Sequence, residues 1–232
     1  MRDVGLLFTS FILLLTPVSL TAGESQVVEI YLERGLKAEK KYDYDTARRN
    51  YDAAISLYPK SRYAYYNRGG FYIRKADCEL ALKDFDTALR LDPTWWWAAN
   101  ARGATYGAMG RYDLALADYN KVLSLRPHGD ILALILNNRA RIEATCPDPK
   151  FRNGEKALAD ARQASSYGRW KATYLGTLAA AYAEVGDFNA AIKYQKRAMA
   201  IVTEEDTLKE PEACLAGYQR HQPYREEPIC PR

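Results

Sequence analysis

A spacing of 34 residues runs through the first half of the chain and constrains its fold more than any other feature. Glycine recurs at this interval as Gly35, Gly69 and Gly103, the aromatic residues as Tyr51, Phe85 and Tyr119, and proline as Pro59, Pro93 and Pro127. A glycine lets a neighbouring segment approach its backbone closely. A proline ends a helix because it lacks an N–H group and its ring clashes with the preceding turn. The spacing therefore predicts repeating pairs of packed helices.

Five windows follow this period, namely Val28–Ser61, Arg62–Trp95, Trp96–Gly129, Ala133–Lys171 and Ala172–Glu205. The fourth is longer than the period by about five residues, and its extra residues include Cys146-Pro147-Asp148-Pro149-Lys150. Two prolines so close together exclude an α-helix, so we expect a loop there. The fifth window has Gln195 in the aromatic position and Thr203 in place of the proline.

The window Trp96–Gly129 resembles the tetratricopeptide repeat, a helix–turn–helix with the pattern W-x2-L-G-x2-Y, A-x3-F and P. The matching residues are Arg102-Gly103 and Tyr106 in the first helix, Ala115 and Tyr119 in the second, and Pro127 at its end. The resemblance implies an all-α fold, an α-solenoid of about five such repeats over residues 28–205. We expect residues 206–220 to form a C-terminal capping helix, because a stacked array needs a polar outer face at its open end. Residues 221–232 are expected to form a tail.

The second half of the chain, about residues 136–227, more closely resembles one subfamily of bacterial, often exported tetratricopeptide proteins. The resemblance lies in the strings ATCPDPKFRNGEKALADARQA and YLGTLAAAYAEVGDFNAAIKYQKRAM and in the sequence Pro-Tyr-Arg-Glu at Pro223–Glu226. It implies a bacterial, exported protein, and it supplies no activity.

Residues 1–22 have the layout of a secretory signal peptide. Arg2 precedes an apolar run at Leu6–Leu15, and small residues follow through Ala22-Gly23. We expect cleavage after Ala22 or Gly23 and a periplasmic or secreted protein. The alternative is an uncleaved segment that anchors the chain to the membrane, although the run is shorter than a span of roughly 20 residues. No other segment is expected to cross a membrane.

The composition argues against catalysis and against nucleic-acid binding. Lys plus Arg exceed Asp plus Glu by 33 to 29, without the basic stripe that nucleic-acid recognition needs. There are only two histidines, and no nucleophile, phosphate-loop, dinucleotide or zinc motif is present. Neighbouring carboxylates such as Asp84 and Asp86 are expected on solvated helix faces. We therefore expect a non-enzymatic protein without metal or cofactor, and the oligomeric state is left open.

The four cysteines leave the disulfide pattern open. Cys78 occupies a position that is aromatic in other repeats, so it is expected in the core. Cys146 belongs to the predicted loop, where the subfamily resemblance implies a lone thiol. Cys214 and Cys230 could form a disulfide in an oxidising compartment and tie the tail to the capping helix. The alternative is that both remain free.

In the tetratricopeptide family, the second, fifth, ninth, twelfth and thirteenth residues of each repeat line a concave groove, which the resemblance implies here. In the five windows these positions are Glu29, Leu32, Leu36, Glu39 and Lys40, then Tyr63, Tyr66, Gly70, Ile73 and Arg74, then Trp97, Asn100, Ala104, Gly107 and Ala108, then Leu134, Asn137, Arg141, Ala144 and Thr145, and last Thr173, Gly176, Ala180, Ala183 and Glu184. The residues predicted to contact a partner are Tyr63, Tyr66, Asn67, Ile73, Arg74, Trp97, Asn100, Asn137 and Arg141. Trp97 could instead pack between repeats with Trp95 and Trp96.

The predicted function is therefore that of an interaction scaffold or adaptor, whose groove binds an extended peptide or a helix of a partner protein. One alternative is a structural subunit of a cell-envelope complex that packs through its convex face. Another is an accessory domain of an enzyme.

Overall fold

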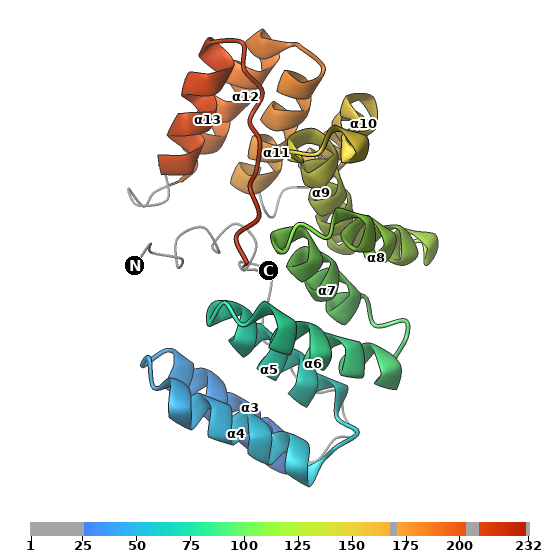
Figure 1. The fold of residues 1–232 in the computed structure, drawn as a ribbon, viewed down its shortest axis with the longest axis vertical. Helices are drawn as coiled ribbons and strands as arrows, with labels where there is room; N and C mark the ends of the chain where they lie inside the picture. The colour runs from blue at the N-terminus through green and yellow to red at the C-terminus, as the bar shows by residue number, and fades with distance from the viewer. Residues whose placement is uncertain (1–25, 168–170, 203–208, 231–232) are drawn as a thin grey trace. The chain divides into compact units, whose positions relative to one another are not determined.

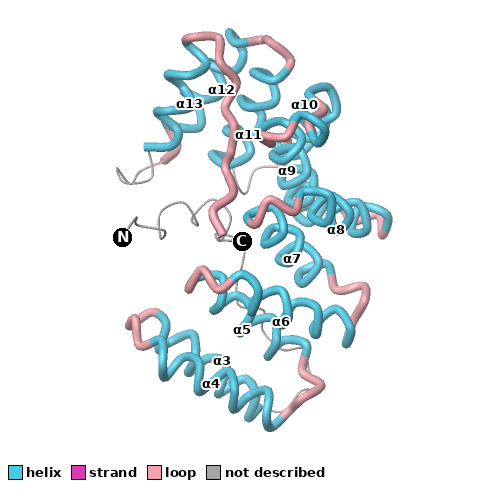
Figure 2. The backbone as a smooth tube through the Cα atoms, in the orientation of Figure 1, coloured by secondary structure: helices cyan, strands magenta, loops and turns pink. Residues whose placement is uncertain are grey.

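A computed structural model describes residues 26–167, 171–202 and 209–230. These residues form eleven α-helices and one short 3-10 helix, with no strand among them (Figures 1 and 2). The predicted all-α fold is confirmed. The predicted signal peptide lies outside the described residues. None of the described helices combines the length and apolar composition that a membrane span requires.

The helices follow one another in antiparallel pairs along the chain. The pairs are α3 (Gln26–Glu39) with α4 (Tyr44–Leu57), α5 (Arg62–Arg74) with α6 (Cys78–Leu91), α7 (Trp96–Ala108) with α8 (Tyr112–Ser124), α9 (Gly129–Thr145) with α10 (Gly154–Ser165), and α11 (Lys171–Glu184) with α12 (Phe188–Met199). Helix α13 (Lys209–Gln219) follows the last pair. Each sequence window overlaps one pair, and α3, α9 and α11 begin two, four and one residues before their windows.

The chain divides into two compact units. Unit 1 comprises the described residues up to Thr105 together with Cys230, and unit 2 runs from Tyr106 to Ile229. The boundary falls within α7. Each unit is described by itself below.

In unit 1, the recurring glycines allow the two helices of a repeat to pack closely. A Cβ atom at Gly35 would lie 2.6 Å from Cε1 of Tyr51, and one at Gly69 would lie 2.6 Å from Cε1 of Phe85. Both rings are completely buried. The recurrence of glycine opposite an aromatic ring, visible in the sequence, is therefore a packing requirement of each helix pair.

A recurring arginine joins consecutive helix pairs. Arg68, directly before Gly69, donates two hydrogen bonds of 2.8 Å to Asp84 and one of 2.7 Å to Asp52 in the preceding repeat. In unit 2, Arg139 makes the corresponding bonds to Asp160 and Asn120. Asp84 is thus a buried structural carboxylate, and the expectation of a solvated face was wrong for it. Desolvation at this site raises the pKa of Asp84, and the hydrogen bonds and positive charge of Arg68 oppose this increase.

The insertion in the fourth repeat is a connection between α9 and α10, and it contains a single 3-10 turn at Pro149–Phe151. The two prolines exclude an α-helix there, and the short 3-10 turn accommodates one of them at its first position. Arg152 closes the connection by donating to the carbonyl oxygens of Cys146 and Pro147, at 2.9 and 3.0 Å.

Gln195 explains why the fifth repeat lacks an aromatic residue in its second helix. Its side chain is buried, and its Nε2 atom donates a 3.0 Å hydrogen bond to the carbonyl oxygen of Pro211, in the first turn of α13. Helix α13 packs through Cys214 and Tyr218 against the small residues Ala179, Ala183 and Ala191. The glutamine thus fixes the start of the helix that follows the last repeat.

Candidate functional site

In unit 1, most of the predicted partner-binding residues are buried. Tyr63 and Tyr66 are 3% and 2% exposed, and their rings lie 5.0 and 5.1 Å from the ring of Trp95. Asn67, Ile73 and Asn100 are also buried. The aromatic residues that looked available for a ligand thus pack against one another.

The remaining two predicted residues of unit 1 have contacts within their own unit. Arg74 donates a 2.8 Å hydrogen bond to Glu39, so its charge is already neutralised. Trp97 is partly exposed and stacks on Trp96 with ring centres 4.0 Å apart.

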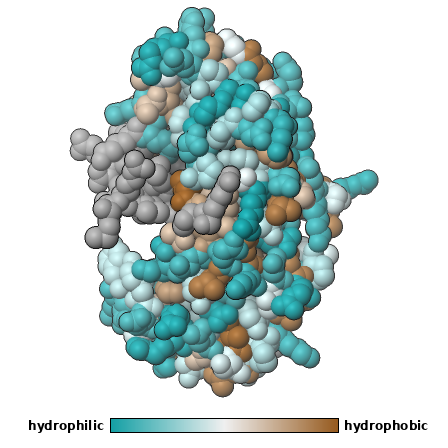
Figure 3. Space-filling model, viewed as in Figure 1, coloured by the Kyte–Doolittle hydropathy of each residue, from teal (hydrophilic) through white to brown (hydrophobic). Residues whose placement is uncertain are grey.

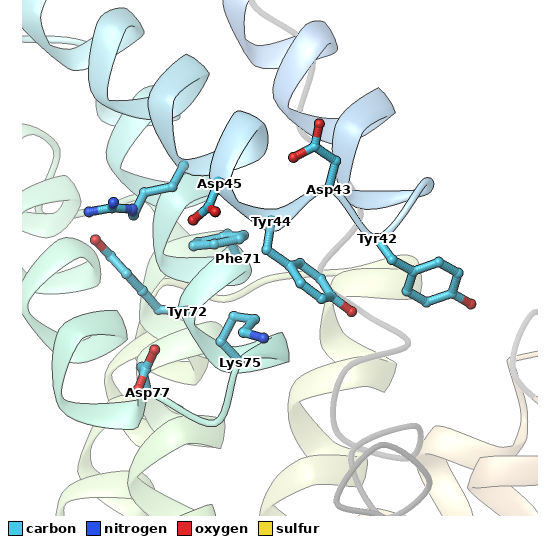
Figure 4. A pocket seen from close by; sticks show the side chains of 9 residues that line it. Tyr42, Asp43, Tyr44, Asp45, Phe71, Tyr72, Lys75 and Asp77 are labelled. Carbon is cyan, nitrogen blue, oxygen red and sulfur yellow. The ribbon is translucent and has the colours of Figure 1, made fainter.

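Unit 1 also has an open cavity of about 470 Å³ beside the turns of its two repeats (Figure 4). Tyr44, Phe71 and Tyr72 line it, and the Lys75 ammonium lies 3.9 Å from the centre of the Tyr44 ring. Asp43 at its rim accepts a hydrogen bond from the backbone N–H of Thr46, and its interactions with the side chain and the backbone of Thr46 lower the pKa of Asp43. The lysine and this aspartate therefore already have structural partners.

The main candidate site lies in unit 2, where the chain itself supplies an extended peptide. After α13 the residues Pro223–Ile229, here called the C-terminal segment, have no regular secondary structure. Figure 1 shows this segment as the red trace that leaves α13 and runs past α11. It contacts the first helices of three consecutive repeats.

Glu226 makes the central contacts of the C-terminal segment. Its carboxylate forms an ion pair of 3.0 Å with Arg141 and accepts a 3.3 Å hydrogen bond from the hydroxyl of Thr145. Its backbone N–H donates to the carbonyl oxygen of Thr145 at 2.9 Å. Both receiving residues belong to α9. Burial raises the pKa of Glu226, and the positive charge of Arg141 opposes this shift.

Arg225 binds an acidic group next to this contact. Its guanidinium forms a 2.7 Å ion pair with Glu184, at the end of α11, and donates to the carbonyl oxygen of Ala144 at 3.2 Å. Glu184 also accepts a 3.0 Å hydrogen bond from Arg152 of the inserted connection. Glu184 therefore lies between two arginines, only one of which belongs to the segment.

The two ends of the C-terminal segment are also held. Tyr224 packs against the cluster of α11, α12 and α13 and donates a 2.9 Å hydrogen bond to Glu210. At the other end, the N–H of Ile229 donates to the carbonyl oxygen of Ala108 at 2.9 Å. Pro228 lies against Gly110, where an added Cβ would be 3.1 Å from its ring. Glycine at this position, with φ of +73°, therefore serves both the turn and the contact.

The residues that receive the segment are groove positions of the repeat pattern. They are the thirteenth position of the third repeat, the ninth, twelfth and thirteenth of the fourth and the thirteenth of the fifth, namely Ala108, Arg141, Ala144, Thr145 and Glu184. Asn137, at the fifth position of the fourth repeat, is 1% exposed. Of the residues predicted to contact a partner, Arg141 is thus the one that meets the segment.

The predicted pairing of Cys214 with Cys230 was wrong. Cys230 forms a disulfide with Cys78, with Cα atoms 6.3 Å apart. Cys214 is a buried free thiol in the cluster under α13, and Cys146 is also free and buried. The physical reason is the extended course of the chain after α13. An extended chain advances about 3.3 Å per residue, so it carries Cys230 away from Cys214 instead of folding back onto it.

Burial makes both free thiols weakly acidic. It raises the pKa of the Cys214 thiol to about 12 and also raises that of Cys146. Neither is therefore expected to react as a thiolate near neutral pH. Among the residues that the structure describes, no group of three or more His, Cys, Asp or Glu side chains could hold a metal ion.

The visible surface agrees with a chain that binds through specific positions. In the view of Figure 3, hydrophilic side chains cover most of the surface and hydrophobic ones are scattered. Exposed apolar residues recur at one repeat position, at the ends of second helices, as Leu57, Leu91, Leu125 and Ile201.

The helix pairs, their 34-residue period and their groove positions define an all-α repeat protein. Models of the tetratricopeptide repeat match residues 63–94, 96–128 and 172–201. These parts of the chain are therefore tetratricopeptide repeats, and such repeats form a scaffold for protein–protein interaction. No curated protein sequence gives a significant match.

Solved structures of other repeat proteins share the fold at low sequence identity. A thermophilic tetratricopeptide protein of Thermus thermophilus is 17% identical, with a TM-score of 0.64, and the match covers 83% of this chain and 99% of that one. PilW, a widely conserved type IV pilus biogenesis factor, is 18% identical with a TM-score of 0.69, over 85% and 91% of the two chains. PilF of Pseudomonas aeruginosa is 14% identical with a TM-score of 0.66, over 83% and 89%.

Proposed function

We propose that this protein is a non-enzymatic adaptor that binds an extended peptide segment of a partner protein along the first helices of unit 2. One observation carries the proposal: an extended stretch of peptide already lies there, held through its backbone at Thr145 and Ala108. Backbone hydrogen bonds to an extended chain are a common basis of peptide recognition, and side-chain pockets add specificity.

The proposed site supplies both kinds of contact. Carbonyl oxygens of the helix ends receive backbone N–H groups, while Arg141 and Glu184 select charges. Complementary charges of this kind give specificity, and the fixed positions of the two charges give directionality. These features support an extended peptide as the ligand over a partner helix, which would satisfy its own backbone groups.

We further propose that the protein acts outside the cytoplasm of a bacterium. The signal-like residues 1–22 support export, and so does the Cys78–Cys230 disulfide, because such bonds persist in oxidising compartments. The exported chain should begin at Gly23 or Glu24. N-terminal sequencing or intact mass that finds Met1 on the exported protein would reject cleavage and favour the membrane-anchored alternative.

Photo-crosslinking in cells tests the adaptor proposal. A photoreactive residue would replace Thr145, which faces the site, or Lys121, which is exposed on the second helix α8 and serves as the control. The experiment is done in the wild-type chain and in a Glu226→Gln background. We expect position 145 to give partner adducts in at least one of the two backgrounds, and position 121 to give none in either. If position 145 yields only adducts with the chain's own C-terminal segment in both backgrounds, the proposal fails.

One observation supports the alternative in which the protein packs through the outer surface of its second helices. Leu57, Leu91, Leu125 and Ile201 are 51%, 38%, 50% and 45% exposed. An apolar residue repeated at one position of the repeat could face a partner surface. In this case Leu57→Glu and Leu91→Glu would abolish partner capture while the adducts from position 145 remain absent.

A further inference from the structure

The C-terminal segment and its receiving residues carry complementary charges in a fixed order. Arg225 meets Glu184 on α11, and the next residue, Glu226, meets Arg141 on α9. A peptide with the two charges exchanged would place Glu against Glu184 and Arg against Arg141. Like charges this close are destabilising. The site therefore discriminates an Arg-Glu sequence from a Glu-Arg sequence.

Some of the residues that contact the C-terminal segment also have hydrogen-bond partners elsewhere in the chain. Glu184 keeps the hydrogen bond from Arg152 when Arg225 leaves. The Thr145 hydroxyl shares its one proton between Glu226 and the carbonyl oxygen of Arg141, 2.7 Å away within α9, and it keeps the second acceptor when the segment leaves. Removing one partner of a buried ion pair is costly when it leaves the other charge unpaired. Here the acidic half of the site retains a cation, which limits the cost of displacing the segment.

The segment is also joined covalently to the rest of the chain on both sides. Helix α13 precedes it, and Cys230, directly after Ile229, is bonded to Cys78. A tethered ligand competes at an effective concentration that reaches the millimolar range for short connections. A free peptide with the same contacts would therefore bind weakly while the segment is in place.

We propose that the C-terminal segment is an internal ligand of the peptide site, and that a partner binds by presenting an extended Arg-Glu sequence in its place. The inference rests on the proposed adaptor function and specifies its ligand. The partner is an extended peptide in which an arginine, facing Glu184, directly precedes a glutamate, facing Arg141. Until it binds, the segment keeps the site closed to weaker ligands.

Competition with a labelled peptide tests the proposal on the full mature chain. The probe is fluorescein-labelled Gln-Pro-Tyr-Arg-Glu-Glu-Pro-Ile, which copies residues 222–229, and its control has the Arg and the first Glu exchanged. Fluorescence anisotropy is measured with the disulfide reduced, so that the segment is free at one end. Two variants that remove the same charge are compared, Glu226→Gln and Glu227→Gln, because Glu227 is the exposed neighbour.

The Glu226→Gln chain should bind the probe more tightly than the Glu227→Gln chain by about tenfold or more, the effect of losing one charge-assisted hydrogen bond in the internal ligand. The exchanged peptide should bind the Glu226→Gln chain about tenfold more weakly than the probe does. Adding Arg141→Gln should remove this preference, and Glu184→Gln provides a second site variant if the first fails to fold. Circular dichroism checks the helix content of every variant.

Equal affinity of the two glutamate variants, equal affinity of the two peptides, or no binding to any folded variant would overturn the proposal. The adaptor function would survive that result if position 145 still crosslinks to a partner, because the partner would then use the site through another sequence. If the crosslinks are also absent, both proposals fail.

Discussion

Replacing Gly69 with alanine should destabilise the protein, whereas the same replacement at Gly176 should stabilise it. Both glycines lie inside first helices of repeats, α5 and α11, but only Gly69 belongs to the series of glycines that recurs every 34 residues. Their surroundings differ accordingly. A Cβ at Gly69 would lie 2.6 and 2.9 Å from two carbons of Phe85, while a Cβ at Gly176 would have no neighbour within 4 Å.

The magnitude follows from two opposing contributions. Alanine is favoured over glycine inside a helix by about 0.5–1 kcal/mol. At Gly69 the completely buried ring of Phe85 would have to shift in a packed core, and such overpacking costs about 1–3 kcal/mol. We therefore expect Gly69→Ala to lower the free energy of unfolding by about 0.5–2 kcal/mol. Gly176→Ala should raise it by about 0.5–1 kcal/mol.

Thermal unfolding followed by circular dichroism measures the difference. For a chain of this size, 1 kcal/mol corresponds to a change in Tm of about 2–4 °C. The two variants should shift Tm in opposite directions. Well below Tm, both should keep the helix content of the wild type. A Gly69→Ala variant that melts at or above the wild-type temperature would refute the close packing of glycine on Phe85, and with it the role of the 34-residue period.

Two further outcomes follow from the structure. In denaturant, two of the four cysteines should react with a thiol reagent before reduction and all four after it; four reactive thiols in unreduced, exported protein would contradict the disulfide. Gln195→Ala removes the side-chain donor to the half-buried carbonyl of Pro211 and should destabilise α13 by about 0.5–1.5 kcal/mol, seen as faster proteolysis at that helix, whereas unchanged cleavage would argue against this bond.

The fold could be predicted from the sequence because its cause is local and repeated. Gly69 and Phe85 recur with their equivalents at fixed spacing, and each pair reports one helix contact. The resemblance to the tetratricopeptide repeat implies which positions line the groove, and the period places Arg141, Thr145 and Glu184 at such positions. These inferences need only neighbouring repeats and no knowledge of distant parts of the chain.

The disulfide and the occupant of the site could not be predicted in this way. Cys78 and Cys230 are separated by 152 residues, and their pairing depends on the path of the extended segment. No periodic pattern records that path. The aromatic cluster of Tyr63, Tyr66 and Trp95 illustrates the same limit, because consecutive aromatic residues fit a binding surface and a packed core equally well. Only the three-dimensional arrangement assigns them to the core.

The central claim is that the first helices of unit 2 hold an extended peptide backbone, and amide hydrogen exchange measured by NMR tests it most directly. The N–H groups of Glu226 and Ile229 donate to Thr145 and Ala108, whereas the structure gives the N–H of Glu227 no backbone acceptor among the described residues. The first two amides should therefore exchange more slowly than that of Glu227 by about tenfold or more. Exchange of all three at the rate of an unstructured peptide would contradict the account.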